Sequence, residues 1–203
     1  MPSSDLLFFF SSSLGYTYLE MRTIIGITGA SGVIYGVNFL RKCPDDKFLI
    51  VSKWGKRVLH EELGLIVEEL SPWAKRMFDD WDLAAPFSSG SNPFDAIVII
   101  PCSVSTLGKI ASGISDTLIT RVAQVALKER RKLVIALRET PLSSIALENA
   151  LKLSREGAVI MPISPPHYIE LKTVNDLVEA FVDRALKMIG VNDGGGWRHE
   201  ELE

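Results

Sequence analysis

Short apolar runs alternate along the chain with longer stretches in which apolar residues recur every three or four positions. The apolar runs predict strands covered on both faces, and the amphipathic stretches predict helices packed against them. The predicted strands are 23–27, 48–51, 96–100, 133–137 and 158–161, with a further short strand expected within 79–93. The predicted helices are 33–40, 53–63, 67–78, 104–112, 116–130, 142–155 and 174–189, and Gly190 is expected to cap the last of them. This alternation predicts an α/β fold with a parallel sheet and right-handed crossovers.

The length and composition indicate one domain with a substantial core. The chain has 203 residues, of which 47% are hydrophobic and 23% are charged, a balance typical of a folded protein. The formal charge of −3 gives no electrostatic reason to propose a nucleic-acid partner. Two cysteines, Cys43 and Cys102, cannot form a disulfide framework, so a reducing cytoplasm is the simplest expected location.

The two ends of the chain differ from the part between them. Residues 1–21 contain no Lys or Arg, and their apolar run at 6–10 is far shorter than the roughly 20 residues of a membrane span, so no membrane association is expected. We expect 1–21 to be an extension, with Met21 as the native start, because a strand pattern begins directly after it. The expected domain is therefore 22–190, followed by a flexible tail at 191–203.

The segments that follow the strands are the first place to look for a ligand site, because ligands of parallel α/β sheets bind beyond the carboxyl ends of the strands. The first strand is followed by Gly29-Ala30-Ser31-Gly32, which leads into a helix. Backbone N–H groups at such a turn attract anions, so phosphate binding is expected, with a tight turn that holds no ligand as the alternative. Ser52 follows the second strand, where an NAD enzyme usually carries an acidic residue. A serine there fits a shorter nucleotide or a helix cap equally well.

The strand at 96–100 is followed by a group of hydroxyl side chains. Ser103, Ser105 and Thr106 lie at the start of a predicted helix, where one of them is enough for capping and the others are available for a phosphate. Cys102 is expected to be a buried small residue rather than a nucleophile, because no histidine lies nearby in the sequence to activate it.

The helix predicted over 116–130 carries a polar stripe. Thr117, Arg121, Gln124 and Lys128 lie on one face at 3.6 residues per turn. A solvated face is the default interpretation of such a stripe. However, the stripe holds no acidic residue to pair with its two cations, so it is expected to hold a second anion.

A further cation ends the strand at 133–137. Arg138 stands directly after this apolar run, a costly position unless an anion or the neighbouring Glu139 satisfies its donors. Tyr168 and Arg184 lie in segments that can reach the same place. The three histidines lack metal-ligand spacing, so no metal is expected. The residues alone thus predict a phosphorylated cofactor and a second phosphorylated ligand.

Several of these segments resemble the UbiX-type flavin prenyltransferases, which belong to the FMN-binding cysteine-decarboxylase-like flavoproteins. The matching segments are 26–32, 101–103 with 106–107, 127–131 and 138–142, and the similarity extends from about Arg22 to Ile189. The resemblance implies a single-domain, doubly wound parallel sheet of the Rossmann-like or flavodoxin-like type. It implies a metal-independent enzyme that joins the dimethylallyl group of dimethylallyl monophosphate to N5 and C6 of reduced FMN. The prenylated FMN would serve a UbiD-type decarboxylase, and the enzyme would be a homo-oligomer, often a dodecamer, with sites near the interfaces.

The resemblance also implies roles for individual residues. The FMN positions would be Gly29, Ala30, Ser31, Ser52, Ser103, Val104, Ser105, Thr106 and Arg138. The prenyl-phosphate positions would be Lys128, Tyr168 and Arg184, with Arg121 and Glu139 beside them. Trp81 would line the prenyl site and support an allylic cation. Glu62 would be the acid near the reacting edge of the flavin, and Glu62, Glu139 and the released phosphate are the candidates for the proton transfers.

Two other functions are compatible with the same residues. An FMN-dependent cysteine decarboxylase shares the fold, but its motif of the Pro-Ala-Ser-Ala-Asn type reads Pro101-Cys102-Ser103 here and lacks the Asn. A non-catalytic flavin carrier would leave Lys128 and its neighbours without a second anion to hold. The mass of the flavin after incubation with reduced FMN and the prenyl donor distinguishes these functions.

Overall fold

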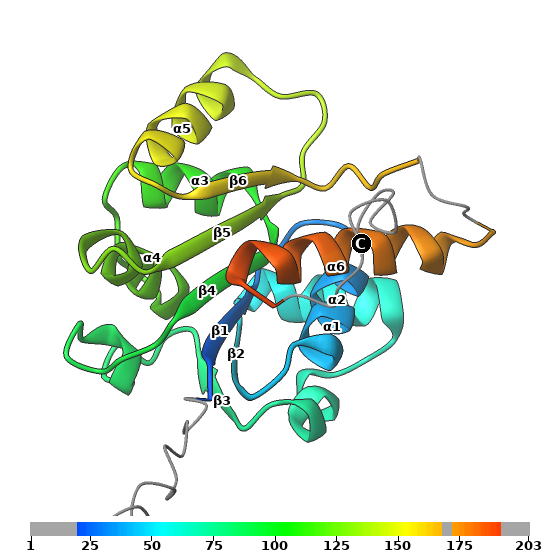
Figure 1. Cartoon of the computed structure of the whole chain (residues 1–203), viewed down its shortest axis with the longest axis horizontal. Coiled ribbons are helices and arrows are strands. Elements are labelled where there is room, and N and C mark those ends of the chain that lie inside the picture. Colours follow the sequence, from blue (N-terminus) through cyan, green and yellow to red (C-terminus); the bar gives the residue numbers. More distant parts are fainter. Residues whose placement is uncertain (1–19, 168–171, 192–203) are drawn as a thin grey trace, which may run out of the picture.

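Six parallel strands form one sheet in the computed structural model, which describes residues 20–167 and 172–191 (Figure 1). The strands are β1 (Arg22–Ile27), β2 (Asp46–Val51), β3 (Arg76–Asp79), β4 (Ala96–Cys102), β5 (Lys132–Leu137) and β6 (Val159–Pro162). The helices are α1 (Val33–Lys42), α2 (Lys53–Leu63), α3 (Val104–Ala111), α4 (Leu118–Lys128), α5 (Ser144–Arg155) and α6 (Val174–Ile189), with two 3-10 turns, η1 (Val67–Trp73) and η2 (Pro86–Ser88).

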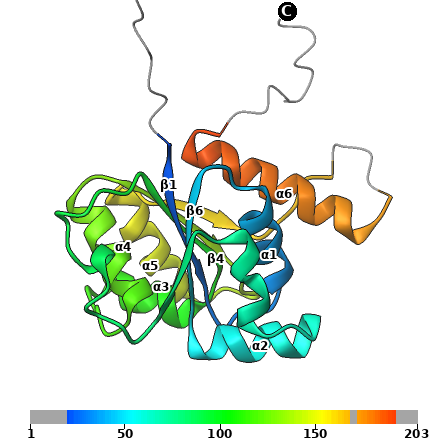
Figure 2. The same cartoon turned by 90° about the horizontal axis from the view of Figure 1, so that it is seen from below.

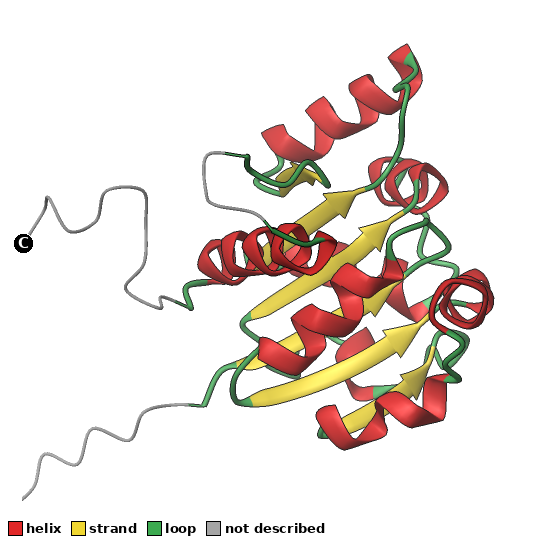
Figure 3. Cartoon of the chain, turned by 90° about the vertical axis from the view of Figure 1, so that its right-hand side faces the viewer, coloured by secondary structure: helices red, strands yellow, loops and turns green. Residues whose placement is uncertain are grey.

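The strand order is β3-β2-β1-β4-β5-β6, which is the doubly wound Rossmann order. In the centre of the sheet, Ile25 of β1 pairs with Leu49 of β2 on one side and with Val98 of β4 on the other. The chain therefore winds outward in both directions from the pair β1 and β4, and Figure 3 shows the strands side by side with the same polarity. The predicted doubly wound parallel sheet is confirmed, and the crevice where its winding reverses lies at the ends of β1 and β4.

Helices cover both faces of the sheet, which explains the continuous apolar runs in the sequence. Ile97 and Ile99 of β4 belong to a core that includes side chains of α3, α4 and α5. Val98 and Ile100 belong to a second core, which includes side chains of α1 and α6. Figure 2 shows these two groups of helices on opposite sides of the strands. All residues of β4 are buried, as expected for a strand between two helical layers.

The region after α2 differs from the prediction. The helix predicted over 67–78 is wrong: the chain forms η1 and then the short edge strand β3, which pairs with β2. Pro72 lies inside η1 and lacks the N–H that a continuing helix needs. Met77 and Phe78 then pack against the opposite core layers, the alternation of a strand. The strand expected within 79–93 is therefore found earlier in the chain, and that segment holds η2 instead.

The predicted end of the central strand is also corrected. The apolar run 96–100 was expected to stop at Pro101, but β4 continues to Cys102. Its pairing with β5 is irregular between Ile99 and Cys102, which accommodates a proline without a donor N–H.

At the far end of the domain, Gly190 caps α6 in the left-handed conformation (φ 100°), as predicted. Within the described residues, no helix has the length and apolar character needed to cross a bilayer.

Candidate active site

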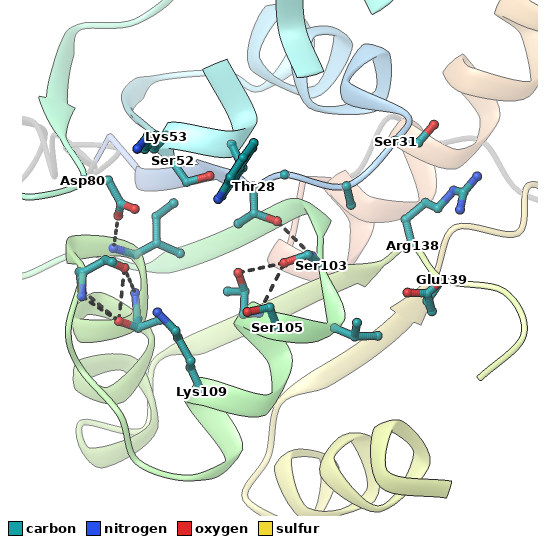
Figure 4. A pocket seen from close by; sticks show the side chains of 18 of the residues that line it. Thr28, Ser31, Ser52, Lys53, Asp80, Ser103, Ser105, Lys109, Arg138 and Glu139 are labelled. Atoms are coloured by element: carbon teal, nitrogen blue, oxygen red, sulfur yellow. Dashed lines mark hydrogen bonds between the residues drawn. The ribbon is translucent and has the colours of Figure 1, made fainter. Parts of the chain in front are cut away.

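A cavity of about 570 Å³ lies at the carboxyl end of the sheet, beside the turns that follow β1 and β4 (Figure 4). Its wall consists of residues 28–31 after β1, 52–54 after β2, 80 and 81 after β3, 103–106 and 109 on α3, 117, 119 and 120 at the start of α4, and 138 and 139 after β5. Segments that are far apart in the sequence meet here because the carboxyl ends of parallel strands share one edge of the sheet. This is the position at which α/β sheets bind ligands.

The residues predicted to bind FMN all line this cavity. They are Gly29, Ala30, Ser31, Ser52, Ser103, Val104, Ser105, Thr106 and Arg138. Trp81 and Glu139, predicted for the prenyl donor and for proton transfer, line the same cavity. The structure therefore brings eleven of the predicted site residues together in the wall of one cavity. The contacts of these residues with FMN and the prenyl donor remain predictions.

Hydrogen bonds lock the two central turns of the cavity together. The hydroxyl of Thr28 donates to the carbonyl of Pro101 at 2.9 Å and accepts from the N–H of Ser103 at 2.9 Å. The hydroxyl of Ser103 accepts from the N–H of Thr106 at 3.3 Å and so caps α3. Capping thus uses Ser103, while the hydroxyl of Ser105 is exposed in the cavity wall. This division matches the surplus of hydroxyl groups noted in the sequence.

The first turn of α2 packs directly on the turn after β1. A Cβ atom on Gly29 would lie 2.3 Å from Cβ of Trp54, so only glycine permits this approach. The hydroxyl of Ser52 accepts from the N–H of Gly55 at 3.0 Å and caps α2. Ser52 therefore fills the helix-cap role left open by the sequence, and it lines the cavity as well.

Arg138 is a cation of the cavity wall that the structure leaves available for an anion. Its N–H donates to the carbonyl of Cys102, which fixes the backbone after β5. Within the described residues its guanidinium forms no ion pair, and the carboxylate of Glu139 instead accepts from the N–H of Thr140 at 3.0 Å. Glu139 therefore does not neutralise Arg138 here. An exposed guanidinium beside several hydroxyl groups is a good partner for a phosphate.

The amino terminus of α1 already holds an anion of this chain. The carboxylate of Glu62 accepts from the N–H groups of Gly32 at 2.9 Å and Val33 at 3.1 Å. Glu62 itself is exposed on α2 and does not line the cavity. The N–H groups at this helix end are therefore occupied by Glu62, and it is the preceding residues 29–31 that line the cavity. The prediction of a phosphate at this turn then applies to 29–31. The sequence could not show this contact because its partners lie thirty residues apart.

The remaining cations predicted for the prenyl phosphate do not line the cavity of their own chain. Arg121 donates through Nε to the carbonyl of Ser88 at 3.2 Å. The expectation that Lys128 lacks an acidic partner is wrong, because its ammonium group pairs with the carboxylate of Glu129, the next residue along the chain. Arg184 is exposed on α6, away from the cavity wall. The prediction for Tyr168 lies outside the described residues.

The sequence interpretation missed one buried acid in the cavity wall. Asp80 is only 4% exposed, and its carboxylate accepts from the N–H of Ile119 at 2.9 Å. Burial raises the pKa of this carboxyl. The sole signal in the sequence was the position of Asp80 immediately before Trp81. Lys53 and Lys109 also line the cavity without having been predicted.

Two further expectations concern reactive groups. Cys102 was expected to be a buried small residue, and this is confirmed, since it is 0% exposed. Burial raises the pKa of its thiol, which disfavours the thiolate required of a nucleophile. Among residues 20–167 and 172–191, no group of three or more His, Cys, Asp or Glu side chains is arranged to hold a metal ion.

Comparison with known proteins gives a consistent set of relatives. The sequence matches the Flavoprotein family over residues 11–186. It is 46% identical over 174 residues to a protein of Thermoplasma acidophilum named flavin prenyltransferase UbiX, covering 85% of this chain and 97% of that protein. It is also 46% identical over 175 residues to the flavin prenyltransferase UbiX of Methanocaldococcus jannaschii, with 85% and 95% covered.

A solved structure provides the same comparison in three dimensions. AnUbiX (PadA1), solved in complex with FMN and dimethylallyl pyrophosphate, is similar with a TM-score of 0.84 and 38% identity, covering 88% of this chain and 100% of that one. The Flavoprotein match spans most of the sequence, and both curated relatives are aligned over nearly their whole lengths. The chain therefore belongs to the Flavoprotein family, among its UbiX-type flavin prenyltransferases.

Proposed function

We propose that this chain transfers the dimethylallyl group of dimethylallyl monophosphate to N5 and C6 of reduced FMN. The observation that carries this proposal is the convergence of the predicted FMN residues, Trp81 and Glu139 in one cavity at the end of the sheet. A flavin carrier needs no aromatic and acidic side chains in the same wall beyond those that bind the cofactor. A prenyltransferase needs both, to accommodate positive charge and to move protons.

FMN fits the chemistry and the size of this cavity. Its volume of about 570 Å³ lies within the roughly 300–1,000 Å³ typical of small-molecule sites. Arg138 and the hydroxyl of Ser105 offer donors to a phosphate, and the turn 29–31 approaches closely because Gly29 has no side chain. Reduced FMN supplies the nucleophilic N5 and C6 positions, and the chain supplies the groups that bind and orient it.

Departure of the phosphate from the prenyl group needs stabilisation of two opposite charges. Breaking the allylic C–O bond leaves negative charge on the phosphate and positive charge on the five-carbon fragment. The cations predicted for this phosphate, Lys128, Arg121 and Arg184, stabilise its growing negative charge when a neighbouring copy presents them. The exposed indole of Trp81 offers a π face that stabilises the allylic cation.

Proton transfers are needed to close the new ring onto C6. Glu139 lines the cavity and is exposed there, so it is suited to accept or return a proton. Glu62 lies beyond Ser31 and holds the start of α1. For Glu62 to act as an acid in this step, its carboxyl group must release the N–H groups of Gly32 and Val33. Glu62→Gln is therefore expected to retain FMN and slow prenyl transfer, and full turnover by that variant removes Glu62 from the mechanism.

Arg121 and Lys128 support the proposal only if another copy of the chain presents them. Both are exposed and lie beside the loop that contains Ser88 and Gly90, rather than in the cavity wall. A similar protein from Escherichia coli O157:H7, titled a dodecameric FMN-dependent UbiX-like decarboxylase, has a TM-score of 0.83 and 40% identity, covering 87% of this chain and 99% of that one. We infer a homo-oligomer, up to a dodecamer, in which these cations and Arg184 complete a neighbouring cavity.

Mixing two inactive variants tests the shared site. Lys128→Ala and Glu139→Gln each disable every site of a uniform oligomer. If one site draws Lys128 and Glu139 from different copies, subunit exchange creates some sites with both native residues and restores activity. If both residues act within one copy, mixed oligomers contain no complete site and stay inactive.

The flavin product tests the proposed reaction itself. The protein is incubated anaerobically with reduced FMN and dimethylallyl monophosphate, and the released flavin is analysed by mass spectrometry. We expect a gain of one C5H8 unit. Unchanged FMN rejects the prenyltransferase, and loss of carbon dioxide from a carboxy-terminal cysteine peptide under the same conditions favours the decarboxylase instead.

The product and location follow from the same proposal. Prenylated FMN is a cofactor rather than an end product, so we propose a UbiD-type decarboxylase as its recipient. Cys43 and Cys102 are both free thiols, the state that a reducing cytoplasm maintains, and we propose that location.

A further inference from the structure

We propose that Asp80 is a positioning residue for prenyl transfer. Its buried carboxylate joins the turn that carries Trp81 to the amino terminus of α4, and so fixes the indole in the cavity wall. This inference rests on the proposed function, in which Trp81 stabilises the allylic cation. It extends that function by naming the group on which the position of Trp81 depends.

The hydrogen bonds of Asp80 show how firmly it holds α4. Its carboxylate Oδ1 accepts from the N–H of Ile119 at 2.9 Å (Figure 4). Its backbone carbonyl accepts from the N–H of Leu118 at 2.7 Å. One residue therefore satisfies the first two N–H groups of the helix. A carboxylate at this end is also favoured by the helix dipole. Since Asp80 is only 4% exposed, water cannot readily replace its contacts.

Trp81 depends on its backbone for its position. It is 65% exposed although it lines the cavity. Among the described residues, its indole takes part in no ring-stacking or cation contact. The backbone N–H of Trp81 donates to the carboxylate of Asp79 at 2.9 Å, and that exposed carboxylate lies 3.9 Å from the ammonium group of Lys56 on α2. An exposed ion pair of this length contributes little. The buried connection between this turn and the cavity wall is made by Asp80, through its hydrogen bonds to α4.

Asp80 also sets a second part of the wall. The side chains of Thr117, Ile119 and Thr120, at the start of α4, line the same cavity as the predicted FMN residues. The hydrogen bonds of Asp80 are made to α4, and none of them reaches 29–31, 103–106 or Arg138. Loss of its carboxylate is therefore expected to disturb prenyl transfer while leaving FMN affinity unchanged.

Two substitutions separate positioning from acid–base chemistry. Asp80→Ala removes the acceptor for the N–H of Ile119, whereas Asp80→Asn keeps an oxygen at that place and removes the charge. We expect Asp80→Ala to lower kcat for prenyl transfer about tenfold, the loss expected when cation–π support is misplaced, with unchanged FMN affinity. We expect Asp80→Asn to restore kcat. Wild-type kcat in Asp80→Ala, or equal losses in both variants, overturns the proposal.

A matched control separates positioning from general loss of stability. Asp95 also accepts from a backbone N–H, that of Arg22 at 2.7 Å, but it lies at the amino end of the sheet. Asp95→Ala is expected to leave kcat unchanged, and a loss equal to that of Asp80→Ala overturns the proposal. Should Asp80→Ala fail to fold, Asp80→Asn alone decides, because a tenfold loss of kcat in that variant contradicts a role carried by the hydrogen bond.

Fluorescence gives a readout that does not depend on turnover. In a chain whose other tryptophans, Trp54, Trp73 and Trp197, are replaced by Phe, the emission of Trp81 reports its surroundings directly. Asp80→Ala is expected to change the emission maximum and anisotropy of Trp81, and Asp80→Asn to preserve them. Identical Trp81 spectra in the wild type, Asp80→Ala and Asp80→Asn overturn the positioning role of Asp80. This readout does not need prenylated FMN to form, so failure of the positioning role is distinguishable from failure of the proposed prenyltransferase activity.

Discussion

Gly29→Ala tests whether the close contact between the turn after β1 and the first turn of α2 is needed to form the cavity. The added Cβ would lie 2.3 Å from Cβ of Trp54 and 3.3 Å from its backbone Cα and carbonyl carbon. Carbon atoms in contact normally lie about 3.5–4.0 Å apart. The substitution therefore needs a displacement of about 1 Å or more.

The displacement must occur in the backbone. Cβ of Trp54 is fixed to the first turn of α2, so rotation of the indole gives no relief, and Trp54→Ala in the same chain is not expected to rescue the variant. Either the turn 29–31 or the segment that begins at Ser52 has to move. Overpacking of this kind costs about 1–3 kcal/mol of stability. Moving the predicted FMN groups by about 1 Å is expected to weaken FMN binding at least about tenfold.

Titration of FMN, followed by quenching of flavin fluorescence, measures the effect on binding, and urea denaturation measures the effect on stability. Gly108→Ala is the matched control, because its nearest neighbour, Nδ2 of Asn149, lies at an ordinary 3.5 Å and the residue is inside α3. That variant is expected to bind FMN normally and to gain about 0.5–1 kcal/mol from the higher helix propensity of alanine. Wild-type FMN affinity in Gly29→Ala would refute the reasoning.

Three further predictions concern capping, thiols and pH. Ser103→Ala removes the side-chain cap of α3, so the free energy of unfolding in urea should fall by about 1 kcal/mol; an unchanged value contradicts this. Burial raises the pKa of Cys43 to about 11 and also raises that of Cys102, so neither thiol should react with Ellman's reagent in the native protein at neutral pH, and a fast-reacting native thiol would count against the structure. Burial raises the pKa of Asp80 above the ordinary value, which means that the folded state binds its proton more tightly than the unfolded state. The wild type should therefore lose stability relative to Asp80→Asn as pH rises from the ordinary Asp pKa, about 3.9, through the raised value, and a gain over that range would show the opposite shift.

The fold could be predicted largely because its strands are buried on both faces. A run such as 96–100 is apolar at every position only when helices cover both sides of the sheet, and the structure has that arrangement. The prediction failed over 67–78, where a 3-10 turn and a short edge strand lie close together. There Pro72 and the pairing with β2 outweigh a helical pattern that extends over few residues.

The candidate site could be predicted where the sheet itself collects the residues. Segments 29–31, 103–106 and Arg138 follow different strands, and their convergence depends only on strand polarity and order. The contact of Glu62 with the start of α1 could not be predicted, because it depends on the packing of α2 against α1. The same holds for Asp80, whose role depends on the place where the turn after β3 meets α4.

Diffraction from crystals grown with FMN and dimethylallyl monophosphate tests the central claim most directly. The account predicts the flavin in the cavity at the ends of β1 and β4, in contact with 29–31 and 103–106. It also predicts the donor phosphate within hydrogen-bonding distance of Lys128 from a neighbouring copy. A flavin bound elsewhere, or a donor remote from the flavin with Lys128 facing solvent in every copy, would contradict it.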